Sequence, residues 1–283
     1  MTEETQQFTS GWLPEKEAED LKALEAQQEV CGQKFLFDWD EVKSRIYAEA
    51  EHYQDWLPQS LPPVYNQNSS NACAAISNAY ACYYLMQLEA AKRHEVTPFM
   101  PFPAWTYMIY HAQIAKDHNY GGCSLAGMLT ANSKYGILPT AAYGKSITDK
   151  EMVALRWNTR VTAAEVYEKY SGQAERWQIK VTRPKTFEDI RACLRAGYPV
   201  NYGTSVQLGL NKSGEYVPNG TTAHAMTWAY YRAGYFGMTN SWNDGFGWEK
   251  EDYVKKQLNG RYFDCFALIG IERDETAKPD WSL

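Results

Sequence analysis

A run of mostly apolar residues from Ala72 to Met86 constrains the fold of this chain more than any other stretch. Ser69, Ser70 and Asn71, all residue types that cap helices, come directly before it. The pattern predicts a largely buried helix, because a helix that is apolar on most sides has to be covered by the rest of the fold. Cys73 is expected in the first turn of that helix.

Helical patterns dominate the first part of the chain and strand-like runs dominate the last part. This order indicates an α+β fold in two lobes, since an α/β fold would alternate the two kinds of element. Helical periodicity covers residues 14–30, 40–56, 103–117, 123–135, 148–156, 163–171 and 186–197. Strand-like runs cover residues 178–181, 199–204, 225–231, 235–239 and 265–271.

The first 54 residues form a separate segment, because the proline-rich residues 57–63 follow them. The two helices expected in this segment are polar, and isolated helices of their length are marginal in water. We therefore expect an amino-terminal arm that docks on the body of the protein or on a partner. The apolar side chains available for docking are Phe35, Phe37, Val42, Ile46 and Tyr53.

The composition excludes several classes of protein. A net charge of −6 leaves no basic footprint for nucleic acid, and no window of 18 apolar residues predicts a membrane span. The first residues are acidic and polar, unlike a signal peptide, so the expected location is the cytoplasm or a particle assembled there. Aromatic residues make up 14% of the chain, which suits tyrosine-rich packing or a contact surface for a protein partner or larger assembly.

The cysteines do not show the spacing of a disulfide framework or a zinc site. In a cytoplasmic compartment they are expected as reduced thiols, most of them small buried residues. We expect neither a metal nor a cofactor. The six positions are Cys31, Cys73, Cys82, Cys123, Cys193 and Cys265.

Four side chains occur in an order that suits acyl transfer by a thiol. The start of a helix and a nearby imidazolium would both lower the pKa of Cys73 and favour its thiolate. His224 offers the imidazole, and Asn240 could fix its tautomer and direction, with Trp242 covering their contact. The side-chain amide of Gln67 and the backbone N–H of Cys73 could stabilise an oxyanion.

Taken singly, each of these residues has an ordinary structural interpretation. A cysteine at a helix start is usually a buried filler, and a histidine in an apolar strand is usually a satisfied core residue. Asn240 could cap a turn, and Gln67 could be a solvated loop residue. The catalytic hypothesis depends on the set, and it makes a geometric prediction: His224 should hydrogen-bond Asn240 and approach the Cys73 sulfur to about 3–4 Å.

The ordered set resembles the papain-like cysteine peptidases over roughly residues 55–270. The matching motifs are the run from Asp55 to Gln67, Cys73 leading into its helix, Gly121-Gly122, the run from Lys134 to Pro139, and Asn240-Ser241-Trp242. The chain also departs from the family pattern. Asn71 stands where a glycine is usual, Ala74 where an aromatic residue is usual, and Phe246 where a second tryptophan is usual.

The resemblance implies a two-lobed papain-like fold with the active-site cleft between the lobes. A helical lobe over residues 55–170 would carry the nucleophile, and an antiparallel, barrel-like β lobe over residues 171–283 would carry the histidine and asparagine. The implied activity is that of a thiol peptidase, which hydrolyses peptide or isopeptide bonds of a polypeptide substrate through an acyl-enzyme. The positions carried over for substrate binding are Gly121, Gly122, Gly203, Ala223 and Trp242.

Two other functions remain open at this point. The same fold could serve as a structural or assembly component, for example a subunit of a virion or complex, that retains an unused site. A related thiol amidase or acyltransferase would use the same residues on other amides. Labelling by a thiol-directed probe separates an active site from an inert one, and peptide and peptidoglycan substrates separate the two enzymes.

The amino-terminal arm has two possible relations to the cleft. Family resemblance offers a segment that crosses the cleft and blocks it until it is removed. Residues 1–54 match no propeptide pattern, however, so the favoured expectation is a permanently docked arm that leaves the Cys73 cleft open. The small residues Gly203 and Ala223 further indicate a pocket with room for a bulky apolar side chain.

Overall fold

A computed structural model shows how these elements are arranged. It describes residues 11–31, 33–52, 57–67, 70–93, 97–116, 121–143, 167–174, 177–242 and 245–273. The expected helix at 148–156 and residues 163–166 of the one at 163–171 lie outside the described residues, as do Tyr53 and the side chain of Cys31. Residues 167–170 are helical, as expected.

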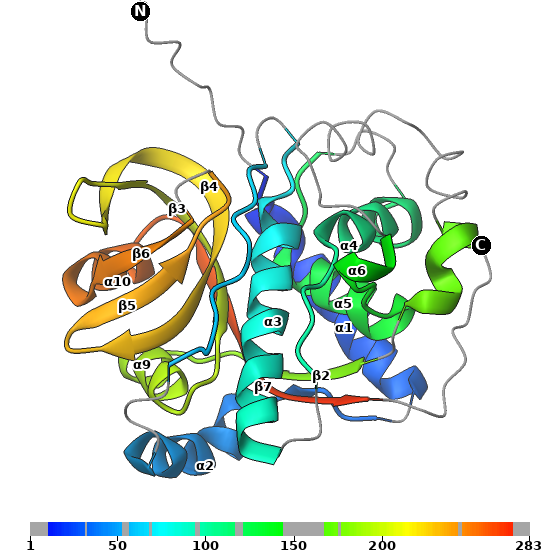
Figure 1. The fold of residues 1–283 in the computed structure, drawn as a ribbon, viewed down its shortest axis with the longest axis horizontal. Coiled ribbons are helices and arrows are strands. Elements are labelled where there is room, and N and C mark those ends of the chain that lie inside the picture. Colours follow the sequence, from blue (N-terminus) through cyan, green and yellow to red (C-terminus); the bar gives the residue numbers. More distant parts are fainter. Residues whose placement is uncertain are drawn as a thin grey trace, which may run out of the picture.

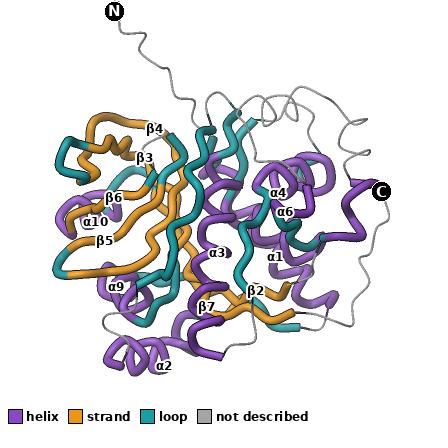
Figure 2. Tube along the Cα trace, in the orientation of Figure 1, coloured by secondary structure: helices purple, strands orange, loops and turns teal. Residues whose placement is uncertain are grey.

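The long helix α3 (Cys73–Arg93) lies between a group of helices and a group of strands (Figure 1). Tyr80, Tyr84 and Leu85 are fully buried along it, as its apolar sequence requires. Figure 2 shows the same division by secondary structure, with most helices on one side of α3 and most strands on the other.

The helical lobe is built around α3 from short helices. They are α4 (Pro103–Ile109), the π-helical turn η2 (Tyr110–Ile114), α5 (Leu125–Tyr135) and α6 (Thr140–Tyr143). Pro103 begins α4, where a missing N–H costs nothing, and the Ser124 hydroxyl caps α5 by accepting from the N–H of Gly127 at 2.8 Å. The turn η3 (Ser171–Gln173) leads towards the strands.

The strands form one seven-stranded sheet that curls on itself. Its order is β1-β2-β7-β3-β4-β5-β6, and β4 also pairs with β6, which closes part of the sheet into a barrel-like lobe. Helices α9 (Phe187–Arg195) and α10 (Glu251–Leu258) pack on this lobe. The strands are β1 (Leu36–Phe37), β2 (Trp177–Thr182), β3 (Val200–Leu210), β4 (Glu215–Arg232), β5 (Tyr235–Thr239), β6 (Phe246–Lys250) and β7 (Phe263–Arg273).

The α+β fold predicted from the order of the patterns is therefore confirmed. Every predicted strand is present, and each predicted helix within the described residues begins within about three residues of its expected start. Four elements were not predicted, namely β1, β6, α6 and α10. Each is short, so its periodicity is too brief to identify.

The amino-terminal segment docks on the body, as expected. After the turn η1 (Pro14–Lys16), α1 (Glu17–Cys31) packs against α5, β1 pairs in parallel with β2 at the edge of the sheet, and α2 (Trp39–His52) packs against α9. We call α1, β1 and α2 the docked arm. Phe35, Val42 and Ile46 are buried in the common core, which confirms three of the predicted docking residues; Phe37 is partly buried against it.

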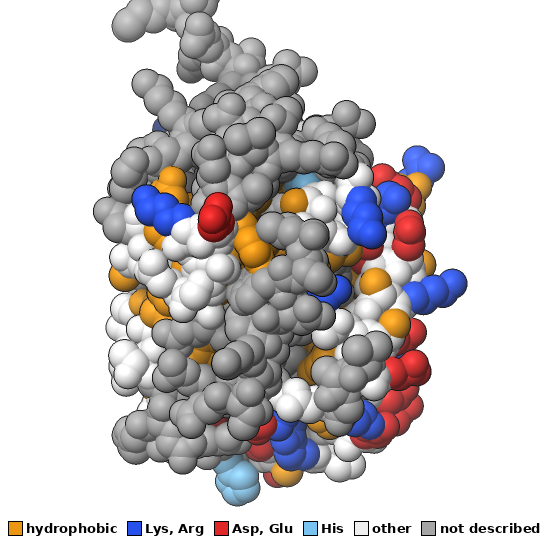
Figure 3. Space-filling view, turned by 90° about the vertical axis from the view of Figure 1, so that its right-hand side faces the viewer, with side chains coloured by type: hydrophobic (Ala, Val, Ile, Leu, Met, Phe, Trp, Pro, Cys, Tyr) orange, Lys and Arg blue, Asp and Glu red, His pale blue; other side chains and the backbone are white. Residues whose placement is uncertain are grey.

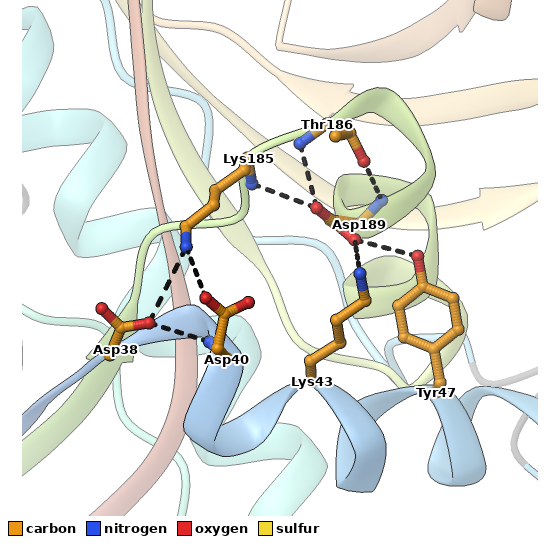
Figure 4. Close-up of polar contacts among 7 residues, drawn as sticks. All are labelled: Asp38, Asp40, Lys43, Tyr47, Lys185, Thr186 and Asp189. Carbon is orange, nitrogen blue, oxygen red and sulfur yellow. Dashed lines mark hydrogen bonds and ion pairs between the residues drawn. The ribbon is translucent and has the colours of Figure 1, made fainter.

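A polar network holds α2 to the start of α9 (Figure 4). The Tyr47 hydroxyl donates to Asp189 at 2.9 Å, and Asp189 also forms a capping box with Thr186. Lys185 reaches Asp40 at 2.9 Å and Asp38 at 3.8 Å. The exposed lysine and the two exposed aspartates contribute little, while the buried Asp189 fixes the start of the helix.

The described surface is mixed in character. On the face seen in Figure 3, acidic and basic side chains lie side by side, with apolar side chains showing between them. Among the described residues, no helix is both long enough and apolar enough to cross a bilayer.

Candidate active site

Cys73 is the first residue of α3, as predicted. Two residues earlier, Asn71 has a φ of 56°, a left-handed conformation that asparagine tolerates better than most residues. Asn71 thus adopts the backbone that a glycine would readily supply at this position. The prediction that Ser70 and Asn71 cap the helix is wrong, because Ser70 Oγ and Asn71 Oδ1 have no hydrogen-bond partner among the described residues.

His224 and Asn240 meet as predicted. His224 lies in β4 opposite Thr204 of β3, and Asn240 follows the end of β5. Nε2 of His224 lies 2.7 Å from Oδ1 of Asn240, and this oxygen also accepts the N–H of Ser241 at 2.7 Å. The amide oxygen is thereby fixed, and Nε2 carries the proton it donates to that oxygen.

Trp242 covers this contact, which confirms its predicted position. Its ring stacks on the imidazole of His224 with a centroid distance of 3.8 Å and an angle of 18° between the planes. All three side chains are at most 6% exposed. Water is therefore kept from competing for the hydrogen bond between His224 and Asn240.

Gln67 is tied to the segment that carries Asn240 and Trp242. Its N–H donates to the carbonyl of Ser241 at 2.8 Å, and its Oε1 accepts from the Ser241 hydroxyl at 2.7 Å. Because the side-chain oxygen is engaged by Ser241, the orientation of the amide is fixed. The loop before α3 and the loop after β5 are thus joined next to Cys73.

No hydrogen bond joins Cys73 and His224 in this state, and their predicted close approach stays a prediction. Nδ1 of His224 has no hydrogen-bond partner among the described residues, so the thiol is not bonded to the imidazole. The Cys73 sulfur instead faces the backbone N–H groups of Ala225 and Gly11, together with those of its own helix start. Ala225 adjoins His224 in β4, while Gly11 belongs to the amino-terminal segment.

Residues 11–13 lie between the two lobes and fill the space in front of Cys73. The carbonyl of Gly11 accepts from the N–H of Cys123 at 2.8 Å, and the N–H of Leu13 donates to the carbonyl of Cys123 at 3.2 Å. On the other side, the N–H of Trp12 donates to the carbonyl of Ala223 at 3.4 Å. We call residues 11–13 the cleft segment, because it bridges the helical lobe and the β lobe.

The cleft segment is packed without spare room. A Cβ added to Gly11 would overlap the backbone of Asn71, and one added to Gly122 would overlap the carbonyl of Gly11. The indole ring of Trp12 lies against Gly203 and is 1% exposed, and its Nε1 donates to Glu17 of α1 at 2.7 Å. The bulky apolar side chain expected beside Gly203 is therefore present, and the chain itself provides it.

One expectation needs correction here. The amino-terminal segment does not leave the cleft open, because Cys73 is fully buried beneath the cleft segment. This segment pairs with the backbone of Cys123, and Gly122 provides the room for its approach. Substrate binding by Gly121 and Gly122 stays a prediction. A segment of three residues carries no periodicity, so the sequence gives no warning of its position.

Burial keeps the thiol and imidazole neutral in this state. Removal from water raises the pKa of Cys73 to about 12, against the N–H groups that point at the sulfur. Removal from water also lowers the pKa of His224 to about 4, and the hydrogen bond to Asn240 opposes this only in part. Burial therefore disfavours a thiolate–imidazolium pair in this state.

Sequence reasoning did not identify Trp12 or Glu17 as residues of the site, whereas Cys123 lies within the stretch 122–124 expected near the specificity pocket. One signal was available for Trp12, since a lone tryptophan after a glycine in an otherwise polar terminus needs a place to be buried. The catalytic hypothesis needed no metal. Among the described residues, no group of three His, Cys, Asp or Glu side chains could hold one.

Solved structures show which fold this is. The chain is similar to xylellain, a cysteine protease from Xylella fastidiosa, with 18% identity and a TM-score of 0.53 over 77% of this chain and 91% of that one. It is also similar to procathepsin B S9 from Trypanosoma congolense, with 12% identity and a TM-score of 0.53 over 94% and 87% of the two chains. No family model and no curated protein matches the sequence. The chain has a papain-like fold that is divergent in sequence.

Proposed function

We propose that this chain with a papain-like fold is a cysteine peptidase, in which Cys73 is the nucleophile and His224 transfers the protons. The observation that supports this most is the state of the imidazole. Asn240 fixes its Nε2, Trp242 covers the ring, and Nδ1 has no partner among the described residues. Nδ1 is thus the nitrogen left for the thiol.

The reaction would proceed through an acyl-enzyme. Nδ1 of His224 takes the thiol proton, and the sulfur of Cys73 attacks the scissile carbonyl carbon to form a C–S bond. The electron pair of the carbonyl moves to its oxygen, which the backbone N–H of Cys73 and the amide of Gln67 stabilise. As the C–N bond breaks, His224 gives the proton to the departing amine.

The second half of the reaction restores the enzyme. His224 removes a proton from water, and the resulting hydroxide attacks the acyl carbon. The C–S bond then breaks, the carboxyl product leaves, and the sulfur recovers its proton from His224. Asn240 holds the ring in one orientation through both halves.

The described state is the latent form of this peptidase. Residues 11–13 fill the space that a substrate needs, and they present the N–H of Gly11 to the sulfur where a substrate has to present a carbonyl carbon. The segment therefore inhibits without being cleaved. It runs parallel to the backbone around Cys123, so a productive substrate would run in the opposite direction.

The occupied cleft also favours a second candidate, an assembly component that keeps an unused site. In that case, freeing the cleft would not yield a reactive thiol. The two candidates differ in the chemistry of Cys73 once residues 11–13 are displaced.

A full-length Trp12→Ala variant tests the proposal, because it removes the side chain that anchors the cleft segment. The protein is treated with an epoxide thiol inhibitor at low excess, and mass spectrometry maps the labelled cysteines. We expect Cys73 to be labelled at least about tenfold faster than in the unaltered chain, ahead of Cys193 and Cys265, since burying an indole contributes several kcal/mol.

Trp39→Ala is the matched control, because Trp39 is an equally buried tryptophan of the same segment that lies outside the cleft. It should not give selective labelling of Cys73. Absence of labelling at Cys73 in the Trp12→Ala variant, or faster labelling of another cysteine, would favour the inert component.

A further inference from the structure

Trp12 shows the size and shape of the pocket beside Cys73. A Cβ added to Gly203 would overlap three carbon atoms of the indole ring, so the ring takes up the volume that a side chain at 203 would need. Gly203 sits in β3 between Ala225 of β4 and Asp264 of β7, which fixes its backbone on both sides. The pocket therefore accepts a large flat ring only because residue 203 is glycine.

Glu17 lies at the N–H edge of the indole ring, next to the part that covers Gly203. Its Oε1 accepts from Nε1 of Trp12 at 2.7 Å. The same carboxylate accepts from the backbone N–H groups of Leu125 at 2.6 Å and Ala126 at 3.1 Å, at the start of α5. Glu17 is 6% exposed and held by the helical lobe, so its position does not depend on Trp12.

The backbone around this pocket is placed to bind an extended peptide. The carbonyl of Ala223 in the β lobe and both backbone groups of Cys123 in the helical lobe are used by residues 11–13. In an antiparallel pair, two opposite residues exchange both hydrogen bonds, so one substrate residue could bind Cys123 with its N–H and its carbonyl. Its side chain would enter the pocket that Trp12 now fills.

We infer that this pocket selects a tryptophan side chain in the substrate, with Gly203 making room for the ring and Glu17 accepting the indole N–H. The inference rests on the proposed peptidase function and names its substrate class. It also gives α1 of the docked arm a part in specificity. The arm would then belong to the active enzyme, and only the cleft segment would have to leave.

Binding of free indoles to the full-length Trp12→Ala variant tests the pocket without using activity. The probes are 3-methylindole, which is the tryptophan side chain, and 1,3-dimethylindole, which lacks the N–H. By calorimetry we expect 3-methylindole to bind about tenfold more tightly, as one additional hydrogen bond predicts, and the unaltered chain to bind neither.

Two further substitutions in the Trp12→Ala background assign the roles. Gly203→Val should reduce indole binding at least about 100-fold, because the side chain refills the pocket. Glu17→Gln should bring the ratio between the two indoles to within about threefold, because the amide cannot satisfy the indole and both N–H groups of α5 as a carboxylate does. Thermal melting establishes that each variant is folded. Equal binding of the two indoles by Trp12→Ala itself, or unreduced binding by Gly203→Val, would overturn the inference.

Hydrolysis of matched peptides tests the tryptophan pocket and the peptidase activity separately. Peptides that differ at a single position, carrying tryptophan, 1-methyltryptophan or alanine, are offered to the Trp12→Ala variant and kcat/KM is measured. We expect tryptophan to exceed 1-methyltryptophan by about tenfold and alanine by about 100-fold or more. Hydrolysis without this preference overturns the inference and leaves the peptidase standing. Selective indole binding without hydrolysis of any peptide overturns the peptidase and leaves the pocket standing.

Discussion

Two parts of the amino-terminal segment contact the body in different ways. The cleft segment, residues 11–13, is held by three backbone hydrogen bonds and one buried indole ring. The docked arm supplies a strand to the sheet and several side chains to the common core, among them Leu24, Phe35 and Ile46. The first set of contacts occupies a site, whereas the second set completes the fold.

The difference shows that one stretch of chain can both occupy the cleft and complete the fold, and that the two parts meet at Pro14. Sequence reasoning treated docking and blocking as alternatives for residues 1–54, and favoured docking with an open cleft. The structure has both, in adjacent parts of the segment. Experiments that remove one part and keep the other can therefore test whether the two sets of contacts are independent.

The largest effect is expected from deleting residues 1–54. The deletion uncovers the edge of β2 and removes several buried side chains, each contributing about 1.5–3 kcal/mol, from a fold whose total stability is about 5–15 kcal/mol. We expect the midpoint of thermal unfolding to fall by more than about 10 °C, or soluble protein to be lost. A truncated chain that melts like the intact one would mean that the arm is dispensable.

Removal of residues 1–13 alone should open the site and preserve the fold. We expect labelling of Cys73 by the epoxide inhibitor to accelerate at least about 100-fold, with thermal unfolding lowered by only a few degrees, because the docked arm remains. Gly11→Ala in the full-length chain is a milder version, since its Cβ would overlap the backbone of Asn71. Equal acceleration at Cys193 and Cys265 would contradict this prediction, as it would indicate general unfolding.

The pH dependence of closure should come from Glu17, which α1 buries beside α5. Burial, together with repulsion by Asp264, raises the pKa of Glu17 from 4.5 to about 7, against the hydrogen bonds from Leu125, Trp12 and Ala126. Departure of Trp12 admits water beside Glu17, so the closed state holds the proton more tightly than the open state. The contribution of Glu17 to closure is therefore largest at low pH and is lost as the pH rises through about 7.

A ratio of labelling rates measures this without interference from the thiol's own titration. The rate at Cys73 in the unaltered chain, divided by the rate in Glu17→Gln, should rise severalfold between pH 5 and pH 8. Burial also raises the pKa of Asp20, which adds in the same direction. Glu249→Gln is the control, because Glu249 is a buried carboxylate of the β lobe that lies far from residues 11–13 in sequence. The rate in the unaltered chain divided by the rate in this variant should not change with pH. For Glu17→Gln, a ratio that falls as the pH rises would mean that Glu17 favours closure at high pH, opposite to the expectation.

The smallest effect is expected at the exposed ion pairs of the arm. Lys185→Ala removes the contacts to Asp38 and Asp40, which are all exposed, so thermal unfolding should change by less than about 2 °C (Figure 4). Asp189→Ala, by contrast, removes a buried cap of α9 and should lower the midpoint clearly more. Equal effects would mean that the arm is held by surface charge.

Much of the fold could be predicted because its elements are long and periodic. The apolar runs of α3, β4 and β7 and the partial alternation in β2 reflect burial that the sequence has to satisfy. β1 has two residues and β6 has five, with Gly247 among them, so neither has enough positions to show a period. Curling of the sheet through the pairing of β4 with β6 depends on contacts distant in sequence, which no local pattern reports.

The candidate site was predictable where side-chain chemistry defines it, and not where backbone defines it. His224, Asn240 and Trp242 were placed correctly because an imidazole, an amide and a covering ring have few other reasons to occur in that order. The cleft segment binds through backbone groups, which every residue carries, so the sequence of residues 11–13 contains almost no trace of it. Glu17 likewise looks in the sequence like an ordinary acid at a helix start, although it accepts hydrogen bonds from the Trp12 indole and from the first N–H of α5.

Burial of Cys73 has a consequence for the durability of the protein. Peroxides and disulfides attack thiolates far faster than thiols, and they have to reach the sulfur. A fully buried sulfur with a pKa near 12 meets neither condition. Under the proposed function, the closed chain is a storage form in which the sulfur of the nucleophile is kept from oxidation, and its vulnerability to peroxide begins when residues 11–13 move away.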